Sequence, residues 1–254
     1  MILKRFFTIV ILFVVGVFIY KQRQAMPNAE QKVVRRTASA DLPASTPVRV
    51  EVATPSVAPV QQRDDAEIRA RLNDGAPGTY IREILVQQDQ MLLRWPERRL
   101  DALRVWIEPV SDVPNWNPQY PLVAEHVFGE WQEAGFPIRF DLQRDSAGAA
   151  IQIRWVTKLV EGGRQIGITR KTRDQNGWIS HAEIDIATFD GLGHALSAET
   201  VGGVARHEVG HALGLGHSPS ASDVMYPEST TPRISATDRA TLHLLYTLPP
   251  GVVK

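Results

Sequence analysis

The 254-residue sequence contains no cysteine, which excludes disulfide bonds and metal sites built on thiolates. It also has no net charge, because 28 lysines and arginines balance 28 aspartates and glutamates. A chain without an overall field of one sign gives no reason to expect nucleic acid as a partner. No internal repeat is visible, and the sequence gives no indication of an oligomeric state. The hydrophobic content of 43% suits a globular domain with additional segments.

The one long apolar run lies near the N-terminus, from Phe6 to Tyr20, with basic residues on both sides. As a helix it would be about 22 Å long, short of the roughly 30 Å hydrocarbon core unless Ile2, Leu3 and snorkelling basic side chains extend it. A cleaved signal peptide is the alternative, although Gln24–Pro27 is a poor cleavage site. We interpret residues 1–24 as a signal anchor or transmembrane helix. The short N-terminal tail then places the remaining chain outside the cytoplasm, in the periplasm or extracellular space, or secreted if the segment is cleaved.

Three further segments follow the apolar run. Residues 25–63 are rich in Pro, Ala, Ser and Thr without a sustained apolar period, which is typical of a flexible linker. Residues 64–95 predict a short helix and then a hairpin over Tyr80–Trp95, and they form either an extension of the next domain or an inhibitory pro-segment. Residues 96–254 hold the regular patterns of one globular domain.

Apolar periodicity in this domain predicts both strands and helices. Alternating apolar residues indicate strands around Leu103–Ile107, Ile151–Trp155, Gln165–Thr169 and Ile179–Ala187. Helices are expected over Pro121–Ala134, from a start between Ser197 and Thr200, and after a capping box at Ser235–Asp238. This order predicts an α+β fold with a mixed sheet behind the second of these helices.

That helix carries the most specific motif, H-E-x-x-H-x-x-G-x-x-H, formed by His207, Glu208, His211, Gly214 and His217. Residues i and i+4 share one helix face, so the first two histidines point the same way, and the glycine lets the chain turn toward the third. Three imidazoles with one open position predict a catalytic Zn²⁺ site, at which zinc lowers the pKa of a bound water to about 7. The glutamate is placed to act as general base toward that water.

The motif resembles that of the metzincin metallopeptidases, in particular the matrixin subgroup. Ser218 follows the third histidine, Met225-Tyr226-Pro227 is similar to the matrixin Met-turn, and Ser235–Asp238 resembles the start of the family's C-terminal helix. The likeness covers about residues 95 to 248. It implies a metzincin-like zincin domain: a twisted mixed sheet, a long helix in the N-terminal half, the zinc-binding helix and a C-terminal helix. It also implies zinc endopeptidase activity.

The sequence departs from the matrixin pattern in three ways. Without cysteine, the thiol that commonly keeps matrixins latent is absent. The structural zinc and calcium loops of the family are not recognisable. The segment after Pro227 lacks the aromatic residue that often helps to form the S1′ pocket. Neither the natural substrate nor its subsite preference follows from the sequence.

Three residues near the ligands have expected supporting roles. Gly214 should adopt a left-handed conformation, which costs little without a Cβ atom. Met225 should form a packed apolar floor beneath the metal. Tyr226 should pack in the cleft wall, and stabilisation of an oxyanion by its hydroxyl is the alternative.

A second group of polar residues comes before the motif. His181, Glu183 and Asp185 share one strand face, because the side-chain period of a strand is two, and Asp190 and His194 follow. We interpret the group as a solvated strand face beside a loop. A Ca²⁺ site or second Zn²⁺ site is the alternative.

The sequence therefore favours a membrane-anchored zinc endopeptidase that acts on protein or peptide substrates outside the cytoplasm. A catalytically silent zinc protein that captures peptides is the first alternative, although such a protein would not need Glu208. A zinc hydrolase for a non-peptide amide or ester is the second.

Overall fold

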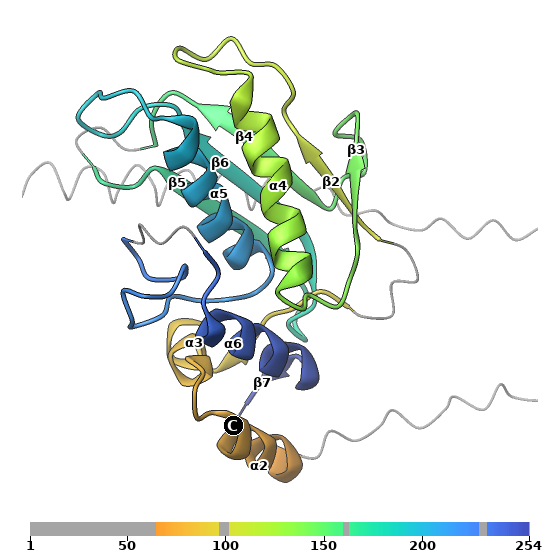
Figure 1. Cartoon of the computed structure of the whole chain (residues 1–254). Helices are drawn as coiled ribbons and strands as arrows, with labels where there is room; N and C mark the ends of the chain where they lie inside the picture. Colours follow the sequence, from red (N-terminus) through yellow and green to blue (C-terminus); the bar gives the residue numbers. More distant parts are fainter. Residues whose placement is uncertain (1–64, 97–101, 160–162, 229–232, 254) are drawn as a thin grey trace, which may run out of the picture. The chain divides into compact units, whose positions relative to one another are not determined.

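The computed structural model describes residues 65–96, 102–159, 163–228 and 233–253, and its main feature is a five-stranded sheet (Figure 1). The strand order is β3-β2-β4-β6-β5. Neighbouring strands are parallel except β5, which runs antiparallel to β6 at one edge. The predicted α+β fold with a mixed sheet is thus confirmed. The strands are β2 (Leu103–Ile107), β3 (Phe140–Gln143), β4 (Ile151–Val156), β5 (Gly167–Arg173) and β6 (Ile179–Ala187).

Two long helices, α4 (Gln119–Glu133) and α5 (Ala198–Ala212), lie side by side over one face of this sheet (Figure 1). Alternate residues of β4 and β6, such as Ile153 and Ile184, point to this face and are fully buried. Burying an aliphatic side chain of this size stabilises the fold by about 1.5–3 kcal/mol. The intervening residues are polar and more exposed, such as Arg154 on β4. The apolar alternation in the sequence therefore decides which face receives the helices.

The helix starts agree with the sequence prediction. Helix α5 begins after Ser197, whose hydroxyl oxygen accepts a hydrogen bond from the Thr200 N–H at 3.1 Å. Helix α6 (Ala236–Thr247) begins with the expected capping box, in which Ser235 and Asp238 each accept the other's backbone N–H. These caps satisfy N–H groups that have no partner within the helix.

The predicted hairpin over Tyr80–Trp95 is wrong. Its first half is helix α3 (Ile81–Gln87), in which Ile81, Ile84 and Leu85 are buried at helical spacing. Its second half contains β1 (Met91–Leu92), which pairs with β7 (Gly251–Val252) near the C-terminus and not with the segment before it. A spacing of three and four between apolar residues fits a helix face better than a strand face.

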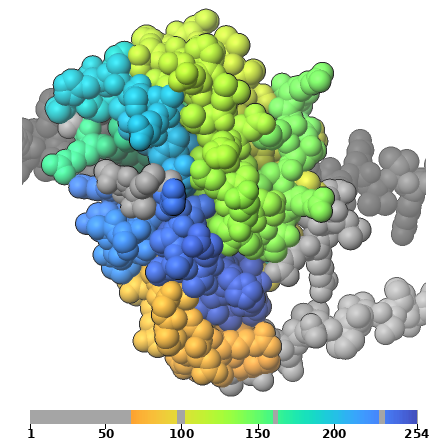
Figure 2. Space-filling model, viewed as in Figure 1, coloured from red at the N-terminus to blue at the C-terminus, as the bar shows by residue number. Residues whose placement is uncertain are grey.

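The residues before the sheet pack into the same hydrophobic core as the sheet itself. Helix α2 (Asp65–Gly75) precedes α3, and Ile68, Tyr80 and Trp95 all belong to that core. Figure 2 shows this orange segment lying against the blue C-terminal segment that holds α6. The domain thus includes α2, α3 and β1 as well as the sheet.

The segments interpreted as an anchor and a linker, residues 1–24 and 25–63, lie outside the described residues. Among the helices of the described part, none combines the length and the apolar character that crossing a membrane requires.

Candidate metal centre

The structure brings the three predicted metal ligands together at the C-terminal end of α5. His207 and His211 lie one helical turn apart, and His217 returns to them after the helix ends. The Nε2 atoms of His211 and His217 are 3.2 Å apart, and the ligand nitrogens of all three residues lie within 4.8 Å of one another. Two nitrogens bound to one tetrahedral zinc ion at ordinary bond lengths lie roughly 3.3 Å apart. The observed separation therefore fits zinc.

The hydrogen bonds of the rings leave Nε2 free to bind a metal. Nδ1 of His207 donates to the carbonyl of Val224 at 2.8 Å, and Nδ1 of His211 donates to the carbonyl of Leu215 at 3.0 Å. A carbonyl oxygen only accepts, so each Nδ1 carries the proton and the neutral ring keeps its lone pair on Nε2. Burial lowers the pKa of all three histidines, including that of His217, which favours the neutral rings that bind metal.

The chain turns from the helix to the third ligand at Gly214, as predicted. Its φ angle is +105°, a left-handed conformation that side chains with a Cβ atom rarely adopt. A Cβ atom at this position would also overlap the carbonyl oxygen of Leu93. The backbone carbonyl of Gly214 accepts a hydrogen bond from the side-chain amide of Gln88 at 3.2 Å. Position 214 therefore requires glycine for two independent reasons, the positive φ angle and the close approach of the Leu93 carbonyl.

The Met-turn packs against the helix that carries the first two histidines. Met225 is fully buried, and a Cβ atom added to Gly210 would collide with its sulfur. The Met225 carbonyl accepts a hydrogen bond from the Ser218 N–H at 2.9 Å. Met225 therefore forms a packed apolar support beside His211 and not a ligand.

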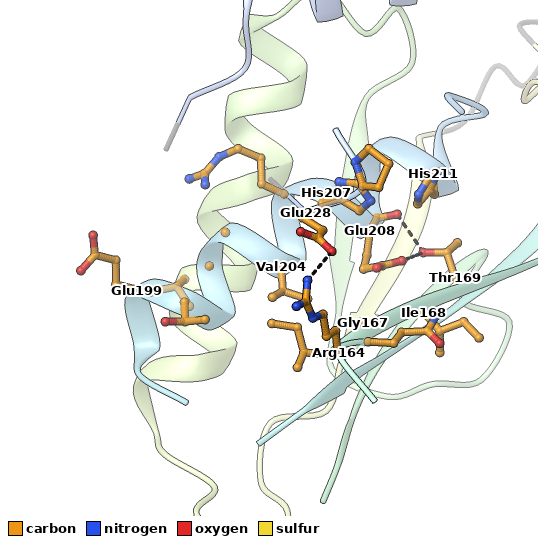
Figure 3. Close-up of a pocket in the computed structure, with 18 of the residues that line it drawn as sticks. Arg164, Gly167, Ile168, Thr169, Glu199, Val204, His207, Glu208, His211 and Glu228 are labelled. Atoms are coloured by element: carbon orange, nitrogen blue, oxygen red, sulfur yellow. Dashed lines mark hydrogen bonds and ion pairs between the residues drawn. The ribbon is translucent and has the colours of Figure 1, made fainter. Parts of the chain in front are cut away.

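Glu208, the predicted general base, is held from the neighbouring strand β5. It is buried, and its carboxylate accepts a hydrogen bond from the Thr169 hydroxyl at 2.7 Å (Figure 3). Gly167 gives it room, because a Cβ atom there would approach the Glu208 carboxylate to 2.5 Å. Burial raises the pKa of Glu208 to about 7, and the Thr169 hydrogen bond and the Lys171 charge act in the opposite direction. A carboxylate with a pKa near neutrality suits proton transfer.

Lys171 is a polar neighbour that the sequence did not identify. Its Nζ donates to the carbonyl of His211 at 2.9 Å, so it contacts the last turn of α5 from the same strand face as Thr169. Burial lowers the pKa of this ammonium to about 8, and the nearby Glu208 carboxylate raises it. One side chain of this edge strand thus binds the predicted base and a second places a positive charge near it.

A large cavity opens beside the histidines. It encloses about 1240 Å³ between strand β5, helix α5 and the segment after the Met-turn. Arg164 and Glu228, which Figure 3 shows facing each other, form an ion pair of 3.0 Å between two of its walls. Tyr226 does not line this cavity, so neither role expected for it gains support. An extended molecule could lie along β5 and reach Glu208 from this space.

The second group of polar residues does not assemble a metal site in the described part of the chain, where only the histidine triad brings three suitable ligands together. Asp185 pairs with Arg170, and Glu183 lies within 3.7 Å of Arg154. These carboxylates alternate along β6 with buried residues such as Ile184, so they lie on the face away from α5. The arginine partners satisfy the negative charge that a cation would otherwise need to balance. The alternative of a Ca²⁺ or second Zn²⁺ site is therefore not supported.

Asp190 and His194 are likewise engaged with each other. The Asp190 carboxylate accepts hydrogen bonds from the backbone N–H groups of Leu192 and His194, and the His194 ring lies 2.9 Å away. These contacts hold the pKa of Asp190 below its usual value, the backbone hydrogen bond of His194 first among them. The contacts between Asp190 and His194 stabilise the loop that follows β6.

Comparison with known proteins agrees with this geometry. The family model described as Matrixin matches residues 117–247, and the chain belongs to the matrixin family. A similar protein is metalloendoproteinase 2-MMP of Arabidopsis thaliana, which is 27% identical over 159 residues. That alignment covers 54% of this chain and 38% of the relative, so the chain matches less than half the length of that protein. The expected resemblance to matrixins is confirmed.

Proposed function

We propose that the protein is a zinc-dependent endopeptidase in which His207, His211 and His217 hold the metal and Glu208 acts as general base. The observation that carries the proposal is the convergence of three imidazole nitrogens beside a buried carboxylate in the lining of a large cavity. When bound, zinc would supply Lewis acidity, which lowers the pKa of a coordinated water to about 7.

The side chains have separate tasks in this mechanism. Glu208 accepts the proton of the attacking water and then delivers it to the amine that leaves. Thr169 fixes the carboxylate through its hydrogen bond to one oxygen, and Glu208 as a whole lines the cavity. The hydrogen bonds from Nδ1 of His207 and His211 hold both rings in the tautomer that a metal requires.

Peptides are the proposed substrates because of strand β5. This strand lies at the edge of the sheet and lines the cavity through Gly167, Ile168 and Thr169. Its outer backbone N–H and C=O groups can pair with an extended peptide backbone. A non-peptide amide or ester would leave those groups unused, which favours a peptide. A protein that only captures peptides would not need a buried carboxylate beside the ligands, because burying that group has a cost.

Removal of the metal should abolish peptide cleavage. We expect the purified chain to cleave an unfolded protein, and dialysis against a strong chelator to reduce the rate by at least about 100-fold. Addition of stoichiometric zinc should restore it. Metal analysis before and after dialysis checks the content, and chelator already saturated with zinc is the control. Cleavage that persists in a sample shown to be free of zinc contradicts the proposal, and peptide binding without cleavage favours the capture function.

We further propose that the apolar run from Phe6 to Tyr20 anchors the peptidase to a membrane and that its catalytic domain acts outside the cytoplasm. The support is the apolar character of the run, which Ile2, Leu3 and snorkelling basic side chains on both flanks can extend to the thickness of the hydrocarbon core. We expect the full chain in the membrane fraction of cells, and a variant without residues 2–24 in the soluble fraction. Protease added to cells whose outer membrane, where one is present, has been opened should degrade the anchored domain. Equal distribution of both forms, or full protection of the domain, contradicts this arrangement.

A further inference from the structure

The last residue of helix α3, Gln87, forms two hydrogen bonds with the backbone of the third histidine, His217. Nε2 of Gln87 donates to the His217 carbonyl at 2.9 Å, and Oε1 of Gln87 accepts from the His217 N–H at 2.7 Å. One planar amide thus holds both polar backbone groups of a single residue. The two residues are 130 positions apart in the sequence, so this contact is purely tertiary.

We propose that Gln87 is a positioning residue for the third zinc ligand, and that α3 is a built-in support of the metal centre and not part of an inhibitory segment. The inference rests on the proposed zinc site. His217 lies beyond the end of α5, and its N–H and C=O make no bond to another backbone group within the described residues. Without Gln87, the nearest backbone restraint on this segment would be the hydrogen bond from the Ser218 N–H to the Met225 carbonyl, which leaves the N–H and C=O of His217 itself unheld.

The approach of Gln87 depends on the glycine just before the ligand. A Cβ atom on Gly216 would lie 2.6 Å from Oε1 of Gln87 and 3.3 Å from the side chain of Ile84. Contacts below 3.0 Å require atoms to move, so even alanine at this position would displace the amide. The hydrogen bonds of Gln87 to His217 therefore require glycine at position 216.

Helix α3 is itself fixed firmly enough to position a ligand. Ile81 and Ile84 are fully buried, and the Tyr80 N–H donates to the Thr241 hydroxyl of α6 at 3.1 Å. The Tyr80 hydroxyl donates to the buried Asp238 carboxylate at 3.0 Å. A side chain at the end of a helix held in this way has a defined direction.

The same helix also reaches the first histidine through a chain of hydrogen bonds. Asp238, which accepts from Tyr80, accepts as well from the Val224 N–H at 2.8 Å. The Val224 carbonyl in turn accepts from Nδ1 of His207 at 2.8 Å. Residues before the sheet therefore support two of the three ligands.

No residue of α2, α3 or β1 lines the large cavity. A segment that inhibits by occupying the cleft would have to lie there. Helix α3 instead contacts the backbone of His217 through the Gln87 side chain, and it does not cover the part of His217 that lines the cavity. This arrangement distinguishes a support from an inhibitor.

The test measures zinc affinity in the full chain by competition with a chromophoric chelator. Gln87→Ala should bind zinc about tenfold more weakly than the unchanged chain, the lower end of the range for groups that orient metal ligands. Val86→Ala is the matched control, because Val86 is the preceding residue of α3, is 74% exposed and should leave zinc affinity unchanged. The melting temperature without metal should be unchanged in Val86→Ala and fall by only a few degrees in Gln87→Ala, because two hydrogen bonds of an exposed side chain are lost. The rise on adding zinc should be smaller for Gln87→Ala.

A double-mutant cycle separates positioning from a general loss of stability. Gly216→Ala should also weaken zinc binding, but it should add little in the Gln87→Ala background, because the amide that it displaces is already gone. Zinc affinity of Gln87→Ala within twofold of the unchanged chain overturns the inference. Fully additive effects in the cycle overturn it as well. If the unchanged chain binds no zinc, the proposed function fails first, and the inference falls with it.

Discussion

Glu208→Gln is expected to keep its zinc and lose roughly 10²–10⁴-fold in kcat for peptide cleavage. Glutamine has the same shape as glutamate, and its amide oxygen can still accept the hydrogen bond that Thr169 donates at 2.7 Å to the native carboxylate. It cannot take up a proton, so the attacking water loses its base. The ligands are untouched, because Glu208 is not one of the three groups that converge.

The measurement pairs zinc content with steady-state kinetics on one peptide. Thr169→Val gives a graded comparison, because it keeps the carboxylate and removes the hydroxyl that orients it; we expect a loss of about tenfold in kcat with little change in KM. The melting temperature of Glu208→Gln should equal or exceed that of the unchanged chain, because a neutral side chain is less costly to bury at this position. Wild-type turnover by Glu208→Gln at full zinc content would remove Glu208 from the mechanism.

The parts of the site that the sequence predicts are those fixed by local geometry. His207 and His211 are four residues apart, so any helix there brings them to one face. The helix boundaries follow from Ser197 and Ser235, which cap the N–H groups next to them in the chain. Gly214 marks the turn because only its φ angle of +105° lets the chain reverse there. Each of these features can be predicted from a stretch of fewer than a dozen consecutive residues.

The parts that the sequence does not predict depend on contacts between distant segments. Thr169 and Lys171 lie 39 and 40 positions from the residues that they contact on α5, and Gln87 lies 130 positions from His217. Nothing local distinguishes the threonine that holds the proposed general base from any other threonine in a strand. Only the antiparallel pairing of β5 with β6, which places Thr169 beside Ile184, directs that side chain toward α5.

One prediction was wrong, and one alternative gained no support, for the same reason. The segment before Trp95 is short and combines apolar residues with a polar run, which led to the hairpin prediction although the spacing of three and four between its apolar residues fits a helix. Burial of Ile81 and Ile84 against the core decides for the helix. The acidic residues of β6 left a cation site open as an alternative to a solvated strand face. Their partners are arginines on neighbouring strands, and strand order is not visible in the sequence.

Gly214→Val is expected to lower both the stability of the domain and its affinity for zinc. A non-glycine residue held in an unfavourable backbone region costs about 1–3 kcal/mol, and the new Cβ atom would also overlap the Leu93 carbonyl oxygen. For a domain of this size that strain lowers the melting temperature by about 5 °C or more. Relief of the strain requires the backbone to rotate at Gly214, which carries His217 away from the other ligands. We therefore expect zinc affinity to fall by at least about tenfold.

Thermal denaturation with and without zinc, together with chelator competition, checks both expectations. Gly129→Ala is the matched control: Gly129 is an exposed residue of α4 with space around an added Cβ atom, so this variant should gain about 0.5–1 kcal/mol of stability and bind zinc normally. Gly214→Ala should change both quantities in the same direction as Gly214→Val, because the overlap begins at Cβ. If Gly214→Ala kept normal stability and zinc affinity, the left-handed turn would not be what delivers the third histidine, and the contact with Gln87 would have to position it alone.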